Sequence, residues 1–331
     1  MHVELVVPAL LQAQAAAPAL QLLLARGRRT PGRPVTLESW YATAFGLGDG
    51  PLPAGALTAL AFGPHAGQGF WLRADPVHLR ADRDRLLLIP GAGFEIAADE
   101  ARELCEALNG HFAAQFTLHA FAPDCWGLQA VADLQQVPLQ TRPPIEIAGR
   151  DVDAELPDKR WHALLNEIQM ALYQHDVNTA REERGVPVVN GVWFWGAGAL
   201  PATAKGPWQS VSTEDPVALG LGKLAGMRHR TPGGGAAAWL ERAAEDGRHL
   251  MVLDSLRGAL ALGDAEALAR GLRALEEHWF APLLAALRGG RIGMLTVRVP
   301  DAGASFETVR GDLRRFWRRP RPLSAYAEVR A

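Results

Sequence analysis

The stretch "HDVNTAREERGVPVVNGVWFWGAG", residues 175–198, is polar where it begins and apolar where it ends. Trp193 and Trp195 alternate along its apolar part, which is typical of a buried strand, and glycines follow. In an α/β sheet, ligands bind at the carboxyl ends of strands, where a glycine turn lets backbone N–H groups approach an anion. The stretch therefore predicts a strand and turn that line a ligand site, at a hinge where an inserted lobe rejoins a core.

The flanking segments predict strands that alternate with helices. Residues 3–10, "VELVVPAL", have the pattern of a short buried strand, and residues 156–175 have apolar positions at helical spacing. Residues 69–91 predict two strands on either side of Pro76, and residues 264–287 predict one long amphipathic helix. This alternation favours a mostly parallel sheet with helices on both faces.

Composition narrows the classes of function. The chain has 331 residues, of which 48% are hydrophobic, and its 34 Lys and Arg nearly balance 36 Asp and Glu. A net charge of −2 gives no general attraction for nucleic acid or an anionic membrane, so nucleic acid is not the expected partner. Two cysteines provide no disulfide framework, and no apolar run is long enough to span a bilayer. We therefore expect a cytoplasmic protein without a membrane segment.

Several phrases resemble the archaeal-type, cofactor-independent phosphoglycerate mutases of the alkaline phosphatase superfamily. The family pattern "HPVN..R...G..PAN.IWLWG.G..P" is matched by the stretch from His175 to Pro201, including Asn178, Arg181 and Asn190. "ALTALAFG" and "FWLRADPVHL" are similar to two further phrases of that family. "WLRADPVHLRADRDRL" and "LLNEIQM" resemble a bacterial family of RpfE-like regulatory proteins more closely still.

The sequence departs from the mutases where they bind metal. The resemblance implies an Asp-Gly ligand after the first strand, where this chain has Ala9 and Leu10. The family's "DEAGHDGD" corresponds to "RGALALGD", which keeps only Gly263 and Asp264, and its "T.DH" corresponds to "TVRVPDAG" without histidine. A site without most of its carboxylates cannot hold two cations against their hydration. We therefore expect no metal, no cofactor and no metal-dependent phosphotransfer.

The resemblance also implies a fold. We expect an α/β protein with an alkaline-phosphatase-like α/β/α core, a mostly parallel sheet and a smaller inserted α+β lobe. Residues 1–84 and 186–331 are assigned to the core and residues 85–185 to the lobe.

Six residues are candidates for binding a small phosphorylated or carboxylate ligand. Arg73 and Asp75 lie in a phrase whose counterpart binds substrate in the resembling family, although a surface ion pair would give the same pattern. His175, Asn178 and Arg181 have a spacing of three, which places them on one side of a helical turn, although Asn178 could equally cap a helix. Asn190 precedes the Trp strand and could be part of the fold architecture. The candidates are Arg73, Asp75, His175, Asn178, Arg181 and Asn190.

Three functions remain open. The leading one is a non-catalytic relative of the mutases with a regulatory or ligand-sensing role, with a protein partner as a further possibility. The second is an active phosphoglycerate mutase or phosphohydrolase whose metal site has moved. The third is a nucleic-acid binder acting through "RGDLRRFWRRPRP", residues 310–322, where arginines alternate with Phe316 and Trp317. A solvated basic edge is the simpler interpretation of that segment.

Overall fold

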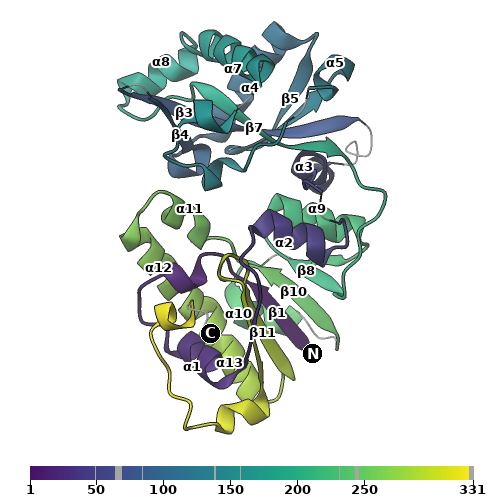
Figure 1. The fold of residues 1–331 in the computed structure, drawn as a ribbon, viewed down its shortest axis with the longest axis vertical. Helices are drawn as coiled ribbons and strands as arrows, with labels where there is room; N and C mark the ends of the chain where they lie inside the picture. Colours follow the sequence, from purple (N-terminus) through teal and green to yellow (C-terminus); the bar gives the residue numbers. More distant parts are fainter. Residues whose placement is uncertain are drawn as a thin grey trace. The chain divides into compact units, whose positions relative to one another are not determined.

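The computed structural model describes residues 1–48, 50–63, 69–83, 85–137, 139–156, 158–230, 232–242 and 246–327, without the side chains of 132 and 133. The chain forms two compact units (Figure 1). Unit 1 combines Met1–Asp49 with Thr203–Ala331, and unit 2 is the continuous segment Gly50–Ala202.

Unit 1 contains a seven-stranded, mostly parallel sheet. The strand order is β2-β12-β11-β1-β10-β8-β9. β1 pairs in parallel with both β10 and β11, whereas β12 runs antiparallel to β11 and β2. The strands are β1 (His2–Val6), β2 (Arg28–Pro31), β8 (Ser210–Ser212), β9 (Arg228–Arg230), β10 (Arg248–Val252), β11 (Met294–Val299) and β12 (Ala304–Val309). The predicted α/β class with a mostly parallel main sheet is confirmed.

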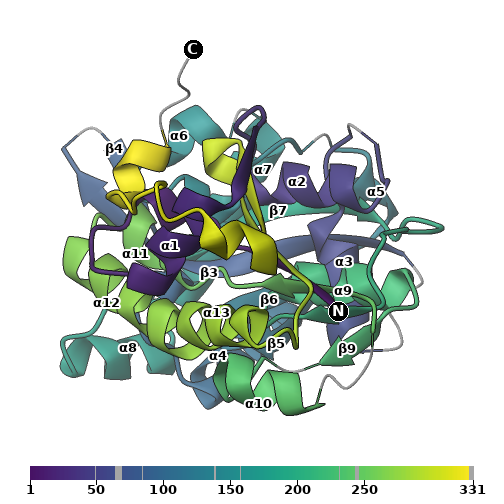
Figure 2. The same cartoon turned by 90° about the horizontal axis from the view of Figure 1, so that it is seen from below.

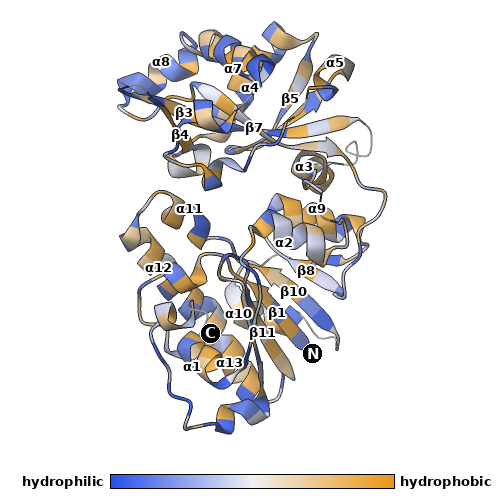
Figure 3. Cartoon of the chain, in the orientation of Figure 1, coloured by the Kyte–Doolittle hydropathy of each residue, from blue (hydrophilic) through white to orange (hydrophobic). Residues whose placement is uncertain are grey.

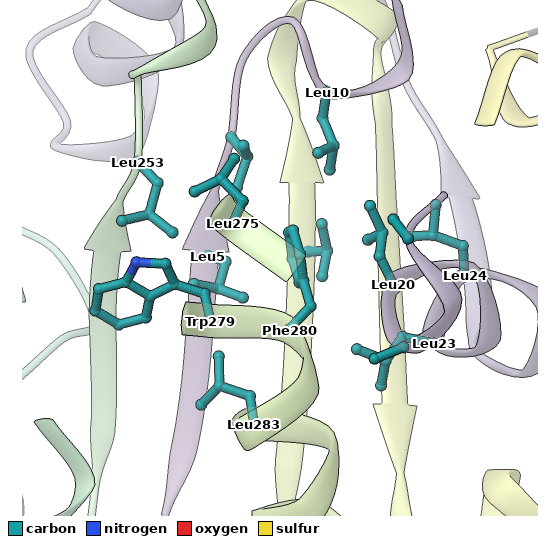
Figure 4. Packing of buried hydrophobic residues seen from close by; sticks show 14 of the residues in the cluster. Leu5, Leu10, Leu20, Leu23, Leu24, Leu253, Leu275, Trp279, Phe280 and Leu283 are labelled. Atoms are coloured by element: carbon teal, nitrogen blue, oxygen red, sulfur yellow. The ribbon is translucent and has the colours of Figure 1, made fainter. Parts of the chain in front are cut away.

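One face of this sheet packs on a large apolar cluster. Val3 and Leu5 of the central strand lie on that face and are fully buried. Figure 4 shows Leu20, Leu23 and Leu24 of α1 on one side of Phe280, with Leu5, Leu275 and Trp279 on the other. The helices of unit 1 are α1 (Pro18–Arg26), α2 (Leu37–Ala44), α9 (Pro216–Leu224), α10 (Gly235–Arg242), α11 (Leu256–Ala261), α12 (Ala265–Leu275) and α13 (Ala281–Arg288). In Figure 2, α1, α12 and α13 lie close together, and each helix contributes residues to the cluster.

The helix predicted over residues 264–287 is interrupted in the middle by a π-helical turn. Asp264 caps α12, and Leu268, Leu272 and Leu275 form its buried face; Figure 3 shows α12 carrying both apolar and polar residues. Between α12 and α13, Glu276–Phe280 is π-helical. A π-turn rotates the side chains that follow it, and such turns often occur at functional sites. The Glu276 carboxylate accepts hydrogen bonds from the first turn of α1.

A buried charge network crosses the middle of the sheet. Glu4 of β1 is fully buried and accepts hydrogen bonds from Arg248 of β10 (2.8 Å), from Arg298 of β11 and from Trp208 (3.0 Å). Burial acts to raise the pKa of Glu4, but the hydrogen bond and charge of Arg298 lead the opposing contributions, and the pKa lies below its usual value. The central strand is thus tied to both neighbours by side chains as well as by backbone.

Unit 2 is built on an antiparallel five-stranded sheet. Its order is β4-β3-β6-β5, and β7 pairs with the other side of β3. The strands are β3 (Phe70–Asp82), β4 (Arg85–Pro90), β5 (Phe116–Ala122), β6 (Cys125–Ala130) and β7 (Gly191–Ala199). The helices are α3 (Ala54–Phe62), α4 (Ala98–Phe112), α5 (Ala132–Gln135), α6 (Val152–Glu155), α7 (Lys159–Leu172) and α8 (Asp176–Glu183).

The unit boundaries differ from the expected division at residues 84 and 186. β3 pairs with β4, β6 and β7, so residues 70–82 form the central strand of the second sheet, and residues 191–199 pair with that strand. If these residues were assigned to the core, the second sheet would lose its central strand. In the described part of the chain, no helix has both the length and the hydropathy needed to cross a membrane.

Candidate functional site

Arg73 and Asp75 form a buried ion pair in β3. The Arg73 guanidinium donates to Asp75 Oδ1 at 2.9 and 2.6 Å and to Thr58 Oγ1 at 3.3 Å. Trp195 of β7 donates its indole N–H to Asp75 Oδ2 at 2.7 Å, and its ring lies 5.3 Å from the Arg73 guanidinium carbon. Burial raises the pKa of Asp75, with Arg73 opposing the shift. The pair is therefore an interior feature of unit 2, unlike the surface ion pair considered from the sequence.

Three of the other candidates hold the chain that enters β7. His175 begins α8 and accepts from the backbone N–H of Val177 at 3.2 Å. The Asn178 amide donates to the carbonyls of Leu172 and Val189, both at 2.9 Å. Asn190 bonds both backbone groups of Leu79, at 2.7 and 2.9 Å. These contacts fix the start of β7 against β3.

Arg181 joins α8 to the first turn of α4. It is 1% exposed, pairs with Glu100 and donates to the carbonyls of Pro187 (2.8 Å) and Glu95 (2.7 Å). Arg73 and Arg181 thus contact different residues of unit 2. The stretch from residue 175 to residue 198 is internal to that unit, which the chain leaves only after Ala202, so it is not the expected hinge. The Trp193 and Trp195 side chains are buried, as expected, and ligand binding by the six candidates stays a prediction.

A second group of polar residues lies at the carboxyl edge of the parallel strands in unit 1. Asp215 follows β8, Asp254 follows β10 and Asp301 follows β11. Since the carboxyl ends of parallel strands meet at one edge, this is where α/β proteins bind ligands. Sequence reasoning did not single out these aspartates, although Asp254 and Asp301 each come shortly after an apolar strand.

Asp215 is held by local hydrogen bonds. Its carboxylate accepts from the backbone N–H of Val217 at 2.8 Å, which caps α9, and from the hydroxyl of the buried Tyr41. Its own N–H donates to Thr213 Oγ1 at 2.9 Å. Burial raises the pKa of Asp215, and burial followed by the Asp215 charge raises the pKa of Tyr41 well above its usual value.

Asp254 is a second carboxylate of this edge with a raised pKa. Burial, and next the charge of Asp215, raise its pKa to about 6, while the Arg257 guanidinium opposes the shift. Arg257 also pairs with Glu38 at 3.0 Å. Carboxylates that titrate near neutral pH are a property of catalytic and ligand-binding sites, although structural networks produce them as well.

Asp254 lines a cavity of about 450 Å³. Ser255, Glu214 and His278 supply further polar groups, and Trp279 is one of its apolar side chains. The backbone of residues 233–235, a run of three glycines, closes another side. His278 and Trp279 both come from the π-helical turn, so this turn forms part of the cavity wall.

The turn that follows β1 is held by hydrogen bonds to Asp301. Ala9 adopts a left-handed backbone (φ 65°), and its N–H donates to Asp301 Oδ1 at 3.0 Å, while Gln12 donates to Asp301 Oδ2 at 2.9 Å. Within the residues that the structure describes, no three His, Cys, Asp or Glu side chains converge in a way that could hold a metal ion. This donor set does not fit the two-cation centre that the sequence resemblance implies.

Comparison with known proteins supports the fold. No protein-family model matches the chain, and no curated protein matches it. The structure of the PH0037 protein from Pyrococcus horikoshii aligns with a TM-score of 0.53 at 12% identity, over 93% of this chain and 87% of that chain. A cofactor-independent phosphoglycerate mutase from Thermoplasma acidophilum DSM 1728 aligns with a TM-score of 0.42 at 18% identity, over 99% of this chain and 95% of that chain. The likeness to the PH0037 protein shows a shared fold.

Proposed function

We propose that this protein is a non-catalytic relative of the cofactor-independent phosphoglycerate mutases with a regulatory, ligand-sensing role. The observation that carries the proposal is Ala9, which occupies the position of the implied Asp-Gly ligand and donates its N–H to Asp301. A two-metal phosphoryl transfer needs several carboxylates around the attacking and leaving oxygens. The regulatory part of the proposal rests on the sequence resemblance to the RpfE-like proteins.

The carboxylates at the same edge support this proposal because they accept hydrogen bonds from other groups of the protein. Asp215 caps α9 and accepts from Tyr41, and Asp301 holds the turn after β1. These hydrogen bonds hold each carboxylate in an orientation set by the protein, and a metal ion would have to bind without disturbing them, because an unsatisfied buried group costs about 1–3 kcal/mol.

The cavity beside Asp254 is where we expect a small phosphorylated or carboxylate ligand. Its volume of about 450 Å³ lies within the range of small-molecule sites, and it combines apolar walls with a few polar groups. An anion would meet the negative charges of Asp254 and Glu214 at neutral pH. Because Asp254 has a pKa of about 6, binding should strengthen as the pH falls through that value.

Two measurements test the proposal. Protein incubated with Mn²⁺ or Zn²⁺ and then freed of unbound metal should retain less than one ion per chain, and it should not interconvert 2- and 3-phosphoglycerate. Two tightly bound ions per chain together with turnover would establish the alternative, an active mutase with a relocated metal site.

Calorimetric titration with 3-phosphoglycerate then tests ligand sensing at this cavity. We expect binding at pH 5.5 that weakens by pH 7.5, and Asp254→Asn should remove most of that pH dependence. Failure of the wild-type protein to bind the probe at either pH would count against the cavity as the sensing site.

A further inference from the structure

A second depression in unit 1 has a very different lining. It has a volume of about 870 Å³ and lies between the end of α1, the edge strand β2, strand β12 and the segment 315–326. We call it the arginine groove. Its six arginines are Arg28, Arg29, Arg315, Arg318, Arg319 and Arg321.

Much of the positive charge in the arginine groove is not neutralised. Arg28 pairs with Glu307, and Arg315 pairs with Asp312 at 2.8 Å. Among the residues that the structure describes, no carboxylate forms a salt bridge with Arg318, Arg319 or Arg321. Guanidinium groups that line one groove give it a positive potential, which attracts anions. The groove therefore favours a ligand with several negative charges.

The groove is built by specific contacts that hold its outer wall against α1. Arg315 donates to the carbonyl of Arg26 at 3.2 Å, and Arg318 donates to the carbonyl of Gly27 at 3.0 Å. Gln21 of α1 donates to the carbonyl of Arg321 at 3.0 Å, and the N–H of Arg321 donates to the Tyr326 hydroxyl at 3.2 Å. These bonds fix the backbone from which the guanidinium groups project, so less order has to be acquired when an anion binds.

An exposed aromatic side chain stands beside these guanidinium groups. Trp317 lines the groove and is 66% exposed, and the neighbouring Phe316 is 77% exposed. Their ring centroids lie 5.3 Å apart at an interplanar angle of 82°. An indole face next to arginines can stack a flat ring while the arginines hold phosphates, and such stacking is a recurrent way to bind a nucleobase.

We propose that the arginine groove binds a nucleoside polyphosphate, whose phosphates contact Arg318, Arg319 and Arg321 and whose base stacks on Trp317. Planar guanidinium groups match pairs of phosphate oxygens better than an ammonium does. The volume of the groove suits one small molecule. The net charge of −2 offers little general attraction for a long nucleic acid strand, so the small ligand is favoured.

This proposal goes beyond the proposed function and does not depend on it. The groove and the cavity beside Asp254 have no lining residue in common. The protein can therefore fail to bind a nucleotide in the groove while the metal and phosphoglycerate measurements agree with the proposed function. It can equally bind a nucleotide there while those measurements contradict the proposed function.

The test is isothermal titration calorimetry on the full chain with ATP, at low and at physiological salt. The double variant Arg319→Ala/Arg321→Ala should weaken ATP binding by about 10–100-fold, because two charge-assisted contacts are lost from a partly solvated site. Arg270→Ala/Arg273→Ala on α12 is the matched control: it removes two charges elsewhere in unit 1 and should change the dissociation constant by no more than about twofold. Circular dichroism checks that each variant is folded.

Further titrations distinguish the contribution of the phosphates from that of the base, and they distinguish a small ligand from a larger one. Tripolyphosphate should bind more weakly than ATP, and Trp317→Ala should reduce the ATP affinity to the tripolyphosphate level. The proposal is overturned if millimolar ATP does not bind, if Trp317→Ala has no effect, or if the control pair weakens ATP as much as the groove pair. Tighter binding to a dT oligonucleotide or to phosphatidylglycerol vesicles than to ATP would assign the groove to nucleic acid or to membrane instead.

Discussion

Replacing Asp254 with asparagine should stabilise the protein above pH 6 and have little effect near pH 4. The folded-state pKa of about 6 lies above the ordinary value of 3.8, so the folded chain binds more protons than the unfolded chain between these values. Stability is therefore lost as the pH rises through that window, and the loss is complete above pH 6. Asparagine cannot ionise, so the variant does not incur this loss.

The magnitude follows from the size of the shift. About two pKa units at 1.36 kcal/mol each set an upper bound of about 3 kcal/mol. Asp254 is only partly buried by its surface area, so solvent screening reduces the expected gain to about 1–2 kcal/mol. For a unit of this size, that corresponds to a rise in melting temperature of roughly 2–8 °C.

The assay is urea unfolding followed by tryptophan fluorescence, for wild type and variant, at pH 4 and at pH 8. The control is Asp264→Asn: this exposed aspartate caps α12, and asparagine caps helices about equally well. The control should change the free energy of unfolding by less than about 0.5 kcal/mol at both pH values. An equal gain from Asp254→Asn at pH 4 and pH 8, or a loss at pH 8, would refute the electrostatic reasoning.

Three further predictions concern stability. Arg181→Ala should destabilise the protein by about 3–5 kcal/mol, because it removes the buried partner of the Glu100 carboxylate and a donor to two backbone carbonyls. Arg184→Ala, whose side chain binds the same carboxylate but is 56% exposed, should cost less than about 1 kcal/mol in thermal unfolding. Gly55→Ala should destabilise by about 1–3 kcal/mol because the added methyl would lie 2.5 Å from the β3 backbone, whereas Gly110→Ala, which meets nothing within 4 Å, should stabilise α4 by about 0.5–1 kcal/mol. Glu4→Gln should lower the free energy of unfolding by about 3–5 kcal/mol, measured in urea at pH 7. Because the pKa of Glu4 is lowered in the folded protein, the difference from wild type should shrink as the pH falls through that pKa. A difference that stays constant down to pH 3 would contradict this prediction.

The sequence predicted the class of fold because the signals for it are local. The apolar run of β1 and the helical spacing of α7 and α12 can be read from a few consecutive residues, and the structure confirms each element. The strand β3 was harder, since a proline in a strand usually marks its end. Here Pro76 lies where the neighbour on one side changes from β6 to β4, while β7 continues to pair with β3 on the other side. The segment does form two strands, but the first one ends at Asp82 and not at Pro76.

The candidate site could not be predicted to the same extent because it depends on pairing between distant segments. Tyr41 and Asp215 are 174 residues apart, and only the strand order brings the ends of β8 and β10 to one edge. The family resemblance implied a metal ligand at the position of Ala9, where this chain has no carboxylate, and it implied nothing about Asp254, which has one. Conversely, four of the six candidates, His175, Asn178, Arg181 and Asn190, match the family pattern, yet the hydrogen bonds described for all six candidates lie within unit 2.

The strand order also determines when the protein can fold during synthesis. Unit 2 is continuous in sequence and can form as soon as residue 202 has emerged, but His2 of β1 pairs with Arg248 and Met294. At ~5–20 residues per second, the first strand waits roughly 15–60 s for its neighbours. An exposed apolar strand is prone to aggregate during such a delay, and a charge within it opposes that. Glu4 places such a charge in β1, and its partners Arg248 and Arg298 reach it only when β10 and β11 have joined the sheet.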